Sequence, residues 1–130
     1  MKLILDTHVA IWAVIGDPRL GTQAKDLLQD DANDLFVSAV SLWEIAIKRR
    51  VTRRAESMPI SCDEAIVEFQ GAGFDLLPVS PTHAAAVERL PMFHRDPFDH
   101  LLLAQALSES MRLVTHDARL ASYDGSVIRV

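Results

Sequence analysis

This chain lacks the features that mark exported or membrane-embedded proteins. Its 130 residues include one cysteine, Cys62, so an internal disulfide is excluded and a reducing compartment is expected. Asp6 and His8 interrupt the first apolar run and no small-residue cleavage site follows it, which argues against a secretory signal. No run approaches the ~20 apolar residues that a transmembrane helix needs. We therefore expect a cytoplasmic protein that has no membrane partner.

An excess of positive charge is also absent. The chain carries 13 Lys and Arg residues against 18 Asp and Glu residues, a formal net charge of −5, so no global basic field attracts nucleic acid. This balance counts only weakly against a nucleic-acid enzyme, because a local basic rim can steer a charged substrate. Apolar side chains, by contrast, make up 49% of the residues. A chain of this length and composition can bury one sizeable core, so we predict a single domain over residues 1–130.

Short apolar segments alternate with helical segments along the whole chain. The predicted strands cover residues 2–5, 35–38, 74–79, 112–115 and 127–130. The predicted helices cover residues 8–15, 22–28, 42–51, 62–70, 83–90 and 98–110. This alternation predicts an α/β protein in which helices cover both faces of a parallel sheet. Pro78 indicates that the third predicted strand lies near an edge or an end of that sheet.

Helix starts are predicted from residues that can cap a first turn. The expected single caps are Thr7, Thr22 and Thr82, and the expected capping boxes are Ser41 with Glu44 and Ser61 with Glu64. Asp96 precedes Pro97 at the start of the long helix over residues 98–110. Proline is favoured at the first helical position, so we predict that Asp96 caps this helix and has a mainly structural role.

Four acidic residues lie where strands end or where the following helices begin. They are Asp6, Glu44, Asp99 and Asp117. In a parallel sheet the carboxyl ends of the strands and the amino ends of the next helices share one edge, so these acids are expected to meet in one crevice. Close carboxylates raise one another's pKa and need cations to stay ionised near pH 7. Hard oxygen ligands suit Mg²⁺ or Mn²⁺ rather than Zn²⁺, and the five histidines lack the spacing of a zinc site.

Such a carboxylate crevice predicts phosphodiester hydrolysis. A divalent cation can lower the pKa of a bound water for attack on phosphorus, and a second cation about 3.5–4 Å away can steady the leaving oxygen. A simpler interpretation is available for each acid, because helix caps and first turns favour carboxylates without any metal. It fits Asp99 and Asp117 well. It fits Asp6 less well, because apolar segments flank it, and Glu44 less well, because Ser41 already caps that helix.

A basic run and two tryptophans leave further choices open. The run contains Lys48, Arg49, Arg50, Arg53 and Arg54. It is either a solvated helix end that complements the helix dipole, or a patch that contacts phosphates or an acidic partner segment. Trp12 and Trp43 are expected in the core rather than as stacking platforms for bases. His94 and His116 are expected as surface or loop residues rather than as general bases.

Four ordered motifs together resemble a PIN domain, and within it the VapC-like ribonuclease toxins of bacterial type II toxin–antitoxin pairs. The motifs are Leu5–His8, Val37–Ile45, His94–Ala106 and Leu113–Asp117. The resemblance implies a three-layer α/β/α sandwich with a parallel five-stranded sheet, and an endoribonuclease that depends on Mg²⁺ or Mn²⁺. It implies Asp6 and Asp99 as the main metal ligands, with Glu44 and Asp117 as secondary acids. It also implies an RNA substrate, a small antitoxin partner and a homodimer. His8 stands where the broader family often has a small residue, so its role stays open.

Three other classes of protein are alternatives to this interpretation. A receiver-type signalling domain needs an acidic pair after the first strand and a late lysine, whereas Asp6 stands alone and the last strands offer His116 and Arg129. A haloacid-dehalogenase-type phosphatase needs a second aspartate two residues after Asp6, where His8 stands. A catalytically silent PIN-like binding module remains an alternative, because all four acids could persist for structural reasons.

Overall fold

The computed structural model describes residues 1–51, 58–91 and 96–130, and in this part of the chain strands alternate with helices as predicted. The elements in chain order are β1 (Lys2–Leu5), α1 (Thr7–Ile15), α2 (Thr22–Gln29), β2 (Asp34–Ser38), α3 (Ala39–Val51), α4 (Cys62–Gly71), β3 (Asp75–Leu77), α5 (Pro81–Ala86), the 3-10 helix η1 (Val87–Arg89), α6 (Pro97–Ser108), β4 (Arg112–Thr115), α7 (Ala118–Ala121) and β5 (Ile128–Arg129). The third and fifth strands are shorter than predicted. Arg53, Arg54, His94 and Arg95 lie outside the described residues.

The sheet has five parallel strands in the order β3-β2-β1-β4-β5. β3 is an edge strand, which confirms the inference drawn from Pro78. The central strand β1 pairs with β2 on one side and with β4 on the other. The strands that follow β1 in the chain therefore extend the sheet first on one side of β1 (β2, β3) and then on the other (β4, β5). Ligands of open α/β sheets bind beside the carboxyl ends of the strands at such a switch point.

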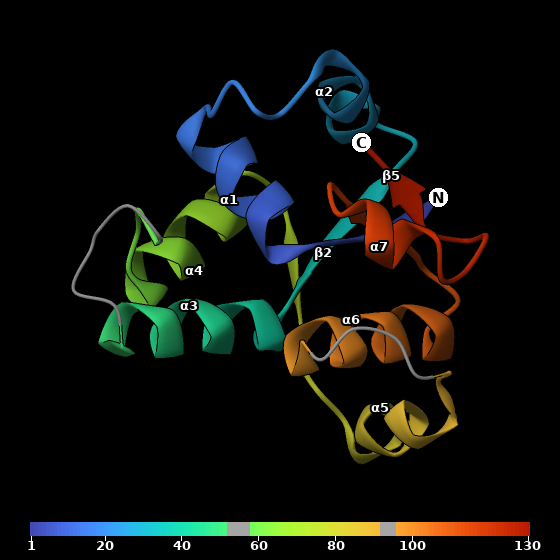
Figure 1. Ribbon diagram of the computed structural model, residues 1–130. Coiled ribbons are helices and arrows are strands. Elements are labelled where there is room, and N and C mark those ends of the chain that lie inside the picture. Colours follow the sequence, from blue (N-terminus) through green and yellow to red (C-terminus); the bar gives the residue numbers. More distant parts are fainter. Residues whose placement is uncertain (52–57, 92–95) are drawn as a thin grey trace.

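Helices cover both faces of this sheet, which confirms the predicted three-layer α/β/α architecture (Figure 1). Alternate residues of β1 supply the two cores, since Leu3 and Leu5 pack under α1, α2 and α4 while Ile4 packs under α6 and α7. Helix α5 packs against α6 on the same side. Among the described residues, no helix combines the length and the apolar character needed to cross a membrane.

Two of the predicted helix starts are confirmed. Ser61 and Glu64 form the capping box of α4, in which the Glu64 N–H donates to Ser61 Oγ and the Ser61 N–H donates to Glu64 Oε1. Asp96 caps α6 by accepting from the Phe98 N–H at 2.9 Å, and Pro97 occupies the first helical position. Both starts depend on contacts within a few residues, so the local sequence was sufficient to predict them.

Three predicted caps are wrong by one or two residues. Asp6 caps α1 in place of Thr7, because its carboxylate accepts from the Thr7 N–H at 2.7 Å. Gly21 precedes α2 in an extended conformation without a side-chain cap, so Thr22 is already the first helical residue. Ser80 caps α5 in place of Thr82, and the reciprocal bond comes from the Nδ1 atom of His83, which accepts from the Ser80 N–H.

The predicted start of α3 is also wrong, since this helix begins at Ala39 directly after β2. The Ser38 hydroxyl accepts from the Val40 N–H, so the helix starts before the Ser41–Glu44 pattern is reached. Ser41 and Glu44 are therefore inner residues of the helix and both are buried. Trp12 lies in the core as predicted, but Trp43 is 55% exposed, because it packs edge-on against Phe98 of α6 outside the core.

Candidate active site

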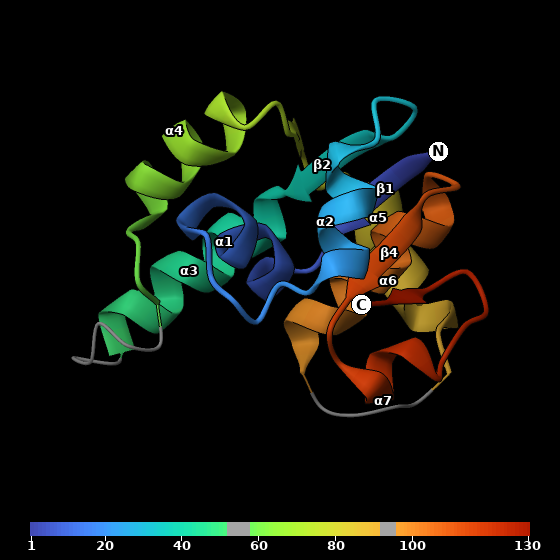
Figure 2. The ribbon, with the colours of Figure 1, turned by 90° about the horizontal axis from the view of Figure 1, so that it is seen from above.

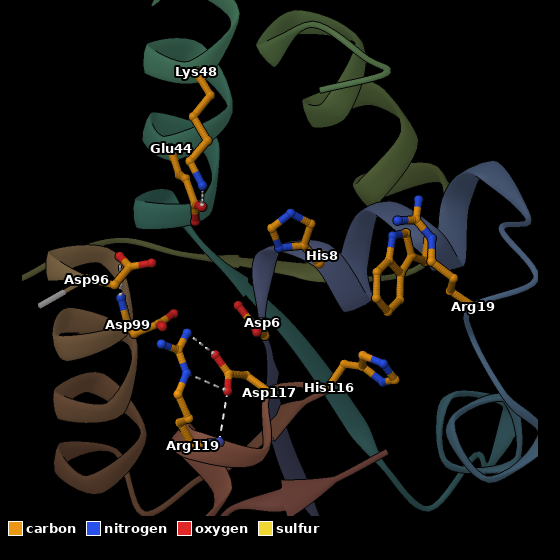
Figure 3. A pocket seen from close by; sticks show the side chains of 11 residues that line it. Asp6, His8, Arg19, Glu44, Lys48, Asp96, Asp99, His116, Asp117 and Arg119 are labelled. Carbon is orange, nitrogen blue, oxygen red and sulfur yellow. Dashed lines mark hydrogen bonds and ion pairs between the residues drawn. The ribbon is translucent and has the colours of Figure 1, made fainter. Parts of the chain in front are cut away.

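A cleft of about 460 Å³ opens at the carboxyl edge of the sheet, beside the end of β1. Seen from above, α1 and α3 lie to one side of the molecule and α6 and α7 to the other (Figure 2). The cleft is lined from both sides by Asp6, His8, Trp12, Arg19, Glu44, Lys48, Asp96, Asp99, His116, Asp117 and Arg119 (Figure 3). All four predicted acids thus line the same cleft, although they come from four separate segments of the chain.

Asp6 lies at the bottom of the cleft, where β1 turns into α1. Its carboxylate accepts from the Thr7 N–H at 2.7 Å and from the Thr115 hydroxyl at 2.8 Å, and the residue is 8% exposed. Burial raises the pKa of Asp6 above its ordinary value, and nearby Glu44 adds to that rise. The hydrogen bond from Thr115 and the field of His8 oppose it. A raised pKa is the property expected of a carboxylate that acts next to a cation.

Glu44 faces the cleft from α3 and is held by a hydroxyl and an ammonium group. Thr7 Oγ1 lies 2.7 Å from Glu44 Oε1 and 2.8 Å from Ser41 Oγ. A hydroxyl has one proton and a carboxylate only accepts, so Thr7 donates to Glu44 and accepts from Ser41. The Lys48 ammonium, one turn later on α3, pairs with the other carboxylate oxygen, Glu44 Oε2. Thr7 therefore serves as a positioning group for Glu44 rather than as the predicted helix cap.

Asp99 and Asp96 reach the cleft from the first turn of α6. The Asp96 carboxylate accepts from the Phe98 N–H at 2.9 Å and more weakly from the Asp99 N–H at 3.4 Å, which confirms the predicted helix cap. Asp99 is 8% exposed and is the third residue of the helix. The partial positive charge of the helix amino terminus favours an acid at this position. The same position turns Asp99 toward Asp6 across the cleft (Figure 3).

Asp117 follows β4 and caps α7, where it is clamped by an arginine. Its carboxylate accepts from the Arg119 N–H at 2.8 Å and from Arg119 Nη2 at 3.0 Å, and Asp117 raises the pKa of the Arg119 guanidinium. The Asp117 N–H donates to the Thr115 hydroxyl at 3.0 Å, and that hydroxyl in turn donates to Asp6. Thr115 thus joins two of the acids, and the Arg119 guanidinium extends toward Asp99 (Figure 3).

The donor chemistry of the cleft fits a hard divalent cation. Carboxylate oxygens are the ligands that Mg²⁺ and Mn²⁺ prefer, and three of the acids, Asp6, Glu44 and Asp99, are almost fully buried. Within residues 1–51, 58–91 and 96–130, however, no three acidic or histidine side chains are close enough to hold one ion together. The positive groups of Lys48 and Arg119 pair with two of the acids, Glu44 and Asp117. The donors to Asp6 described above are neutral, so Asp6 is a better candidate for a direct ligand than Glu44 or Asp117.

The opposite wall of the cleft has a different chemistry that the sequence did not reveal. Arg19 lies over the Trp12 ring with its guanidinium carbon 4.8 Å from the ring centroid. The His116 and Trp12 rings are packed edge-on, with their centroids 5.2 Å apart. His8 lies one turn before Trp12 on α1, with the two ring centroids 6.0 Å apart. The spacing of four residues between His8 and Trp12 could have indicated one shared helix face. Trp12 is therefore both a core residue and part of the cleft.

Lys48 and Arg119 are further cleft residues that the sequence analysis did not place in the site. Lys48 was assigned to a basic run at the end of a helix, although its spacing of four residues from Glu44 is that of a helical ion pair. Arg119 is two residues after Asp117. At this spacing its N–H and Nε groups can donate to the Asp117 carboxylate only when the chain turns there. Arg49 of the same basic run donates to the Met58 carbonyl at 2.9 Å and has a structural role.

Comparisons with known proteins agree with the fold. The sequence matches the model of the PIN domain family over residues 3–126. It is 32% identical over 123 residues to Ribonuclease VapC22 of Mycobacterium tuberculosis, covering 93% of this chain and 91% of that relative. VapBC2 from Rickettsia felis, bound to a promoter DNA fragment, has a TM-score of 0.69 at 15% identity over 100% of this chain and 98% of that one. VapBC-5 from Mycobacterium tuberculosis has a TM-score of 0.63 at 22% identity over 99% and 98% of the two chains. At these identities the two solved structures indicate a common fold.

Proposed function

The chain belongs to the PIN domain family, and from the chemistry of its cleft we propose that it is an endoribonuclease that depends on Mg²⁺ or Mn²⁺. The observation that carries the proposal is that four carboxylates from separate segments line one cleft at the switch point of the sheet. The relative of 32% identity is named a ribonuclease, which supports RNA as the substrate. Membership of this family also sets aside the receiver and phosphatase alternatives.

Each acid has a distinct role in this proposal. Asp6 and Asp99 are the main metal ligands, because both are buried and they face each other across the cleft. Glu44 and Asp117 are secondary, because each is already paired with a cationic side chain. A divalent cation held here would activate water and neutralise the phosphate's charge. Thr7 and Thr115 keep the carboxylates oriented through their hydroxyl hydrogen bonds.

Lys48 and Arg119 are assigned to the phosphates of the RNA. Both side chains line the cleft, and both are partly exposed, so a phosphate oxygen can approach them. Their charge offsets the acidic lining that would otherwise repel a polyanion. Nε and Nη2 of Arg119 already donate to Asp117, so we assign Arg119, like the Lys48 ammonium, a charge interaction with the phosphate rather than a bidentate clamp.

The proposed partner is a small antitoxin, with this chain acting in the cytoplasm as the toxin of the pair. Two of the structurally similar proteins are VapBC complexes, and a third is described as a toxin–antitoxin complex from Klebsiella pneumoniae. The lone Cys62 is consistent with a reducing compartment. Co-purification with the protein encoded by the neighbouring gene, followed by loss of ribonuclease activity in the complex, would support this assignment. Full activity in a saturated complex would contradict it.

A homodimer is proposed through the exposed Trp43 of α3 and the half-buried Phe98 of α6 beside it. Trp43 is 55% exposed and meets Phe98 edge-on with the ring centroids 5.2 Å apart. Tryptophan is enriched in protein interfaces, so a second copy is the occupant that we assign to this surface. Sedimentation velocity should give twice the mass of one chain for the wild type and a single-chain mass for Trp43→Ser. A single-chain mass for both proteins would contradict the dimer.

The test of the enzyme is cleavage of single-stranded RNA with Mn²⁺ and with EDTA. We expect fragments with Mn²⁺, none with EDTA, and none for Asp6→Asn with an unchanged circular-dichroism spectrum. Asp26→Asn is the matched control, because Asp26 is an exposed aspartate of α2 that does not line the cleft. Cleavage that persists in EDTA, or in Asp6→Asn, would contradict the proposal. RNA binding without any cleavage would favour the silent binding module instead.

A further inference from the structure

The wall of the cleft opposite the acids contains a rigid stack of an arginine on a tryptophan. Arg19 lies over the Trp12 ring at 4.8 Å, and Trp12 itself is only 7% exposed, so the ring is fixed by the core beneath it. Two Arg19 donors, Nε and Nη2, reach the two oxygens of Asp17 at 3.1 and 2.8 Å. The guanidinium is therefore held by the Trp12 ring on one side and by the Asp17 carboxylate at its Nε–Nη2 edge.

This geometry decides which part of Arg19 a ligand can use. The fork of Nε and Nη2 is engaged by Asp17, so Arg19 is poorly placed to clamp a phosphate through that edge. Arg19 lowers the pKa of Asp17 to about 2, so the pair stays ionised near neutral pH. The side chain of Arg19 is nevertheless 63% exposed. What it presents to the cleft is a flat cationic surface.

Two imidazoles border this surface and also line the cleft. The Nδ1 atom of His116 donates to the Val130 carbonyl at 2.8 Å, since a carbonyl can only accept. The planes of the His116 and Trp12 rings make an angle of 74°, so the two rings are packed edge-on. His8 approaches Trp12 from α1. In Figure 3 these side chains lie on one side of Asp6, and Asp99 and Asp117 lie on the other.

We propose that Arg19, held over the Trp12 ring, is a stacking platform for a nucleobase of single-stranded RNA that flanks the scissile phosphate. This inference rests on the proposed ribonuclease function and names a residue that selects the substrate. Unstacked bases of single-stranded RNA bind on aromatic rings and guanidinium planes, whereas bases within a duplex are already stacked on one another. The platform and the acids share one cleft, so one RNA strand can contact both.

The test uses the full-length protein with Mn²⁺ and a pool of random single-stranded RNA, with sequencing of the cleaved ends. Arg19→Ala removes the platform, and Arg19→Lys keeps the charge but removes the plane. Arg89→Ala is the matched control, because Arg89 is an exposed arginine of η1 that does not line this cleft. Thermal melting of each variant checks that it is folded.

We expect Arg19→Ala to lower kcat/KM on the order of ten-fold, mainly through KM, and to flatten the base preference at one position beside the cut. Arg19→Lys should behave like Arg19→Ala, and Arg89→Ala like the wild type. Wild-type rates and base preference in Arg19→Ala would overturn the inference while the ribonuclease proposal stands. Restoration by Arg19→Lys would overturn the stacking role in favour of a simple charge.

Two further outcomes also overturn the platform. If Arg19→Ala keeps the wild-type cleavage profile but is no longer inhibited by the antitoxin, the surface binds a peptide and not a base. If the wild-type protein cleaves no RNA in the same experiment, the ribonuclease proposal fails and this inference fails with it. The wild-type lane therefore tests the function, and the Arg19 lanes test the platform alone.

Discussion

Helix α6 contributes to two regions of this molecule with opposite demands. Leu102 is fully buried in the apolar core against the sheet, and Asp99, three residues earlier, is 8% exposed in the acidic cleft. Burial of Leu102 stabilises the fold through the hydrophobic effect. Burial of Asp99 beside other carboxylates works against folding, because it desolvates charges of one sign. The comparison indicates that the apolar core stabilises the fold, whereas the buried carboxylates of the cleft lower that stability but form the site.

The largest effect that would sharpen this contrast is expected for Asp99→Ala. Removing a main metal ligand should lower RNA cleavage by roughly 10³-fold or more, since several kcal/mol of charge stabilisation are lost. The fold should remain intact or become more stable in EDTA, because repulsion between carboxylates is relieved. Cleavage assays and thermal melting of the same preparation measure both effects. Undiminished activity would refute the assignment of Asp99.

The matching substitution on the core side of α6 is Leu102→Ala. Deleting a fully buried leucine leaves a cavity, so we expect the free energy of unfolding to fall by about 2–5 kcal/mol. Cleavage per folded molecule should stay close to the wild-type value at a temperature where the variant is folded. Urea denaturation and the RNA assay test the two statements. A loss of cleavage activity without a loss of stability in Leu102→Ala would contradict the separate roles assigned to the core and the cleft.

The cleft should also differ from the core in its response to pH. The folded-state pKa of Asp6 is raised, mainly by burial, so above pH ~4 the folded state binds more protons than the unfolded state. Asp6 therefore lowers stability as pH rises through this window. In EDTA, Asp6→Asn should raise the melting temperature more at pH 7 than at pH 4, while Asp26→Asn should change little. An equal gain at both pH values would contradict this account of Asp6.

The smallest effect concerns the basic run, where the structure separates the two interpretations residue by residue. Lys48 lines the cleft, whereas Arg50 is exposed at the end of α3 and does not. Lys48→Ala should weaken RNA binding and reduce the salt dependence by about one unit of slope, because one phosphate contact is lost. Arg50→Ala should bind like the wild type. Unchanged RNA binding by Lys48→Ala at every salt concentration would favour the interpretation of the basic run as a solvated helix end.

The sequence predicted those features that depend on local pattern. The five strands, the parallel sheet, the capping box at Ser61 and the cap at Asp96 are confirmed, because alternation and short-range hydrogen bonds determine them. The shared edge of a parallel sheet was sufficient to bring the four acids to one cleft.

What the sequence could not supply are contacts between distant segments. The Thr7 hydroxyl turns to Glu44 instead of capping its own helix, and Thr115 bridges to Asp6 from 109 residues away. Trp43 is exposed on α3 and meets Phe98 of α6, which is a contact between distant segments. The stack of Arg19 on Trp12 needs the turn between α1 and α2, which brings the arginine back over the ring. These are tertiary contacts, which propensity and periodicity do not encode.

The most direct test of a metal-binding acidic cleft is a crystal structure of the protein soaked in Mn²⁺, with the ion located by its anomalous scattering. We predict Mn²⁺ in the cleft, coordinated by carboxylate oxygens of Asp6 and Asp99, and its disappearance in Asp99→Ala. An ion bound on another surface of the protein, or a cleft that takes up no Mn²⁺ while Glu44 and Asp117 keep their pairs with Lys48 and Arg119, would contradict the account.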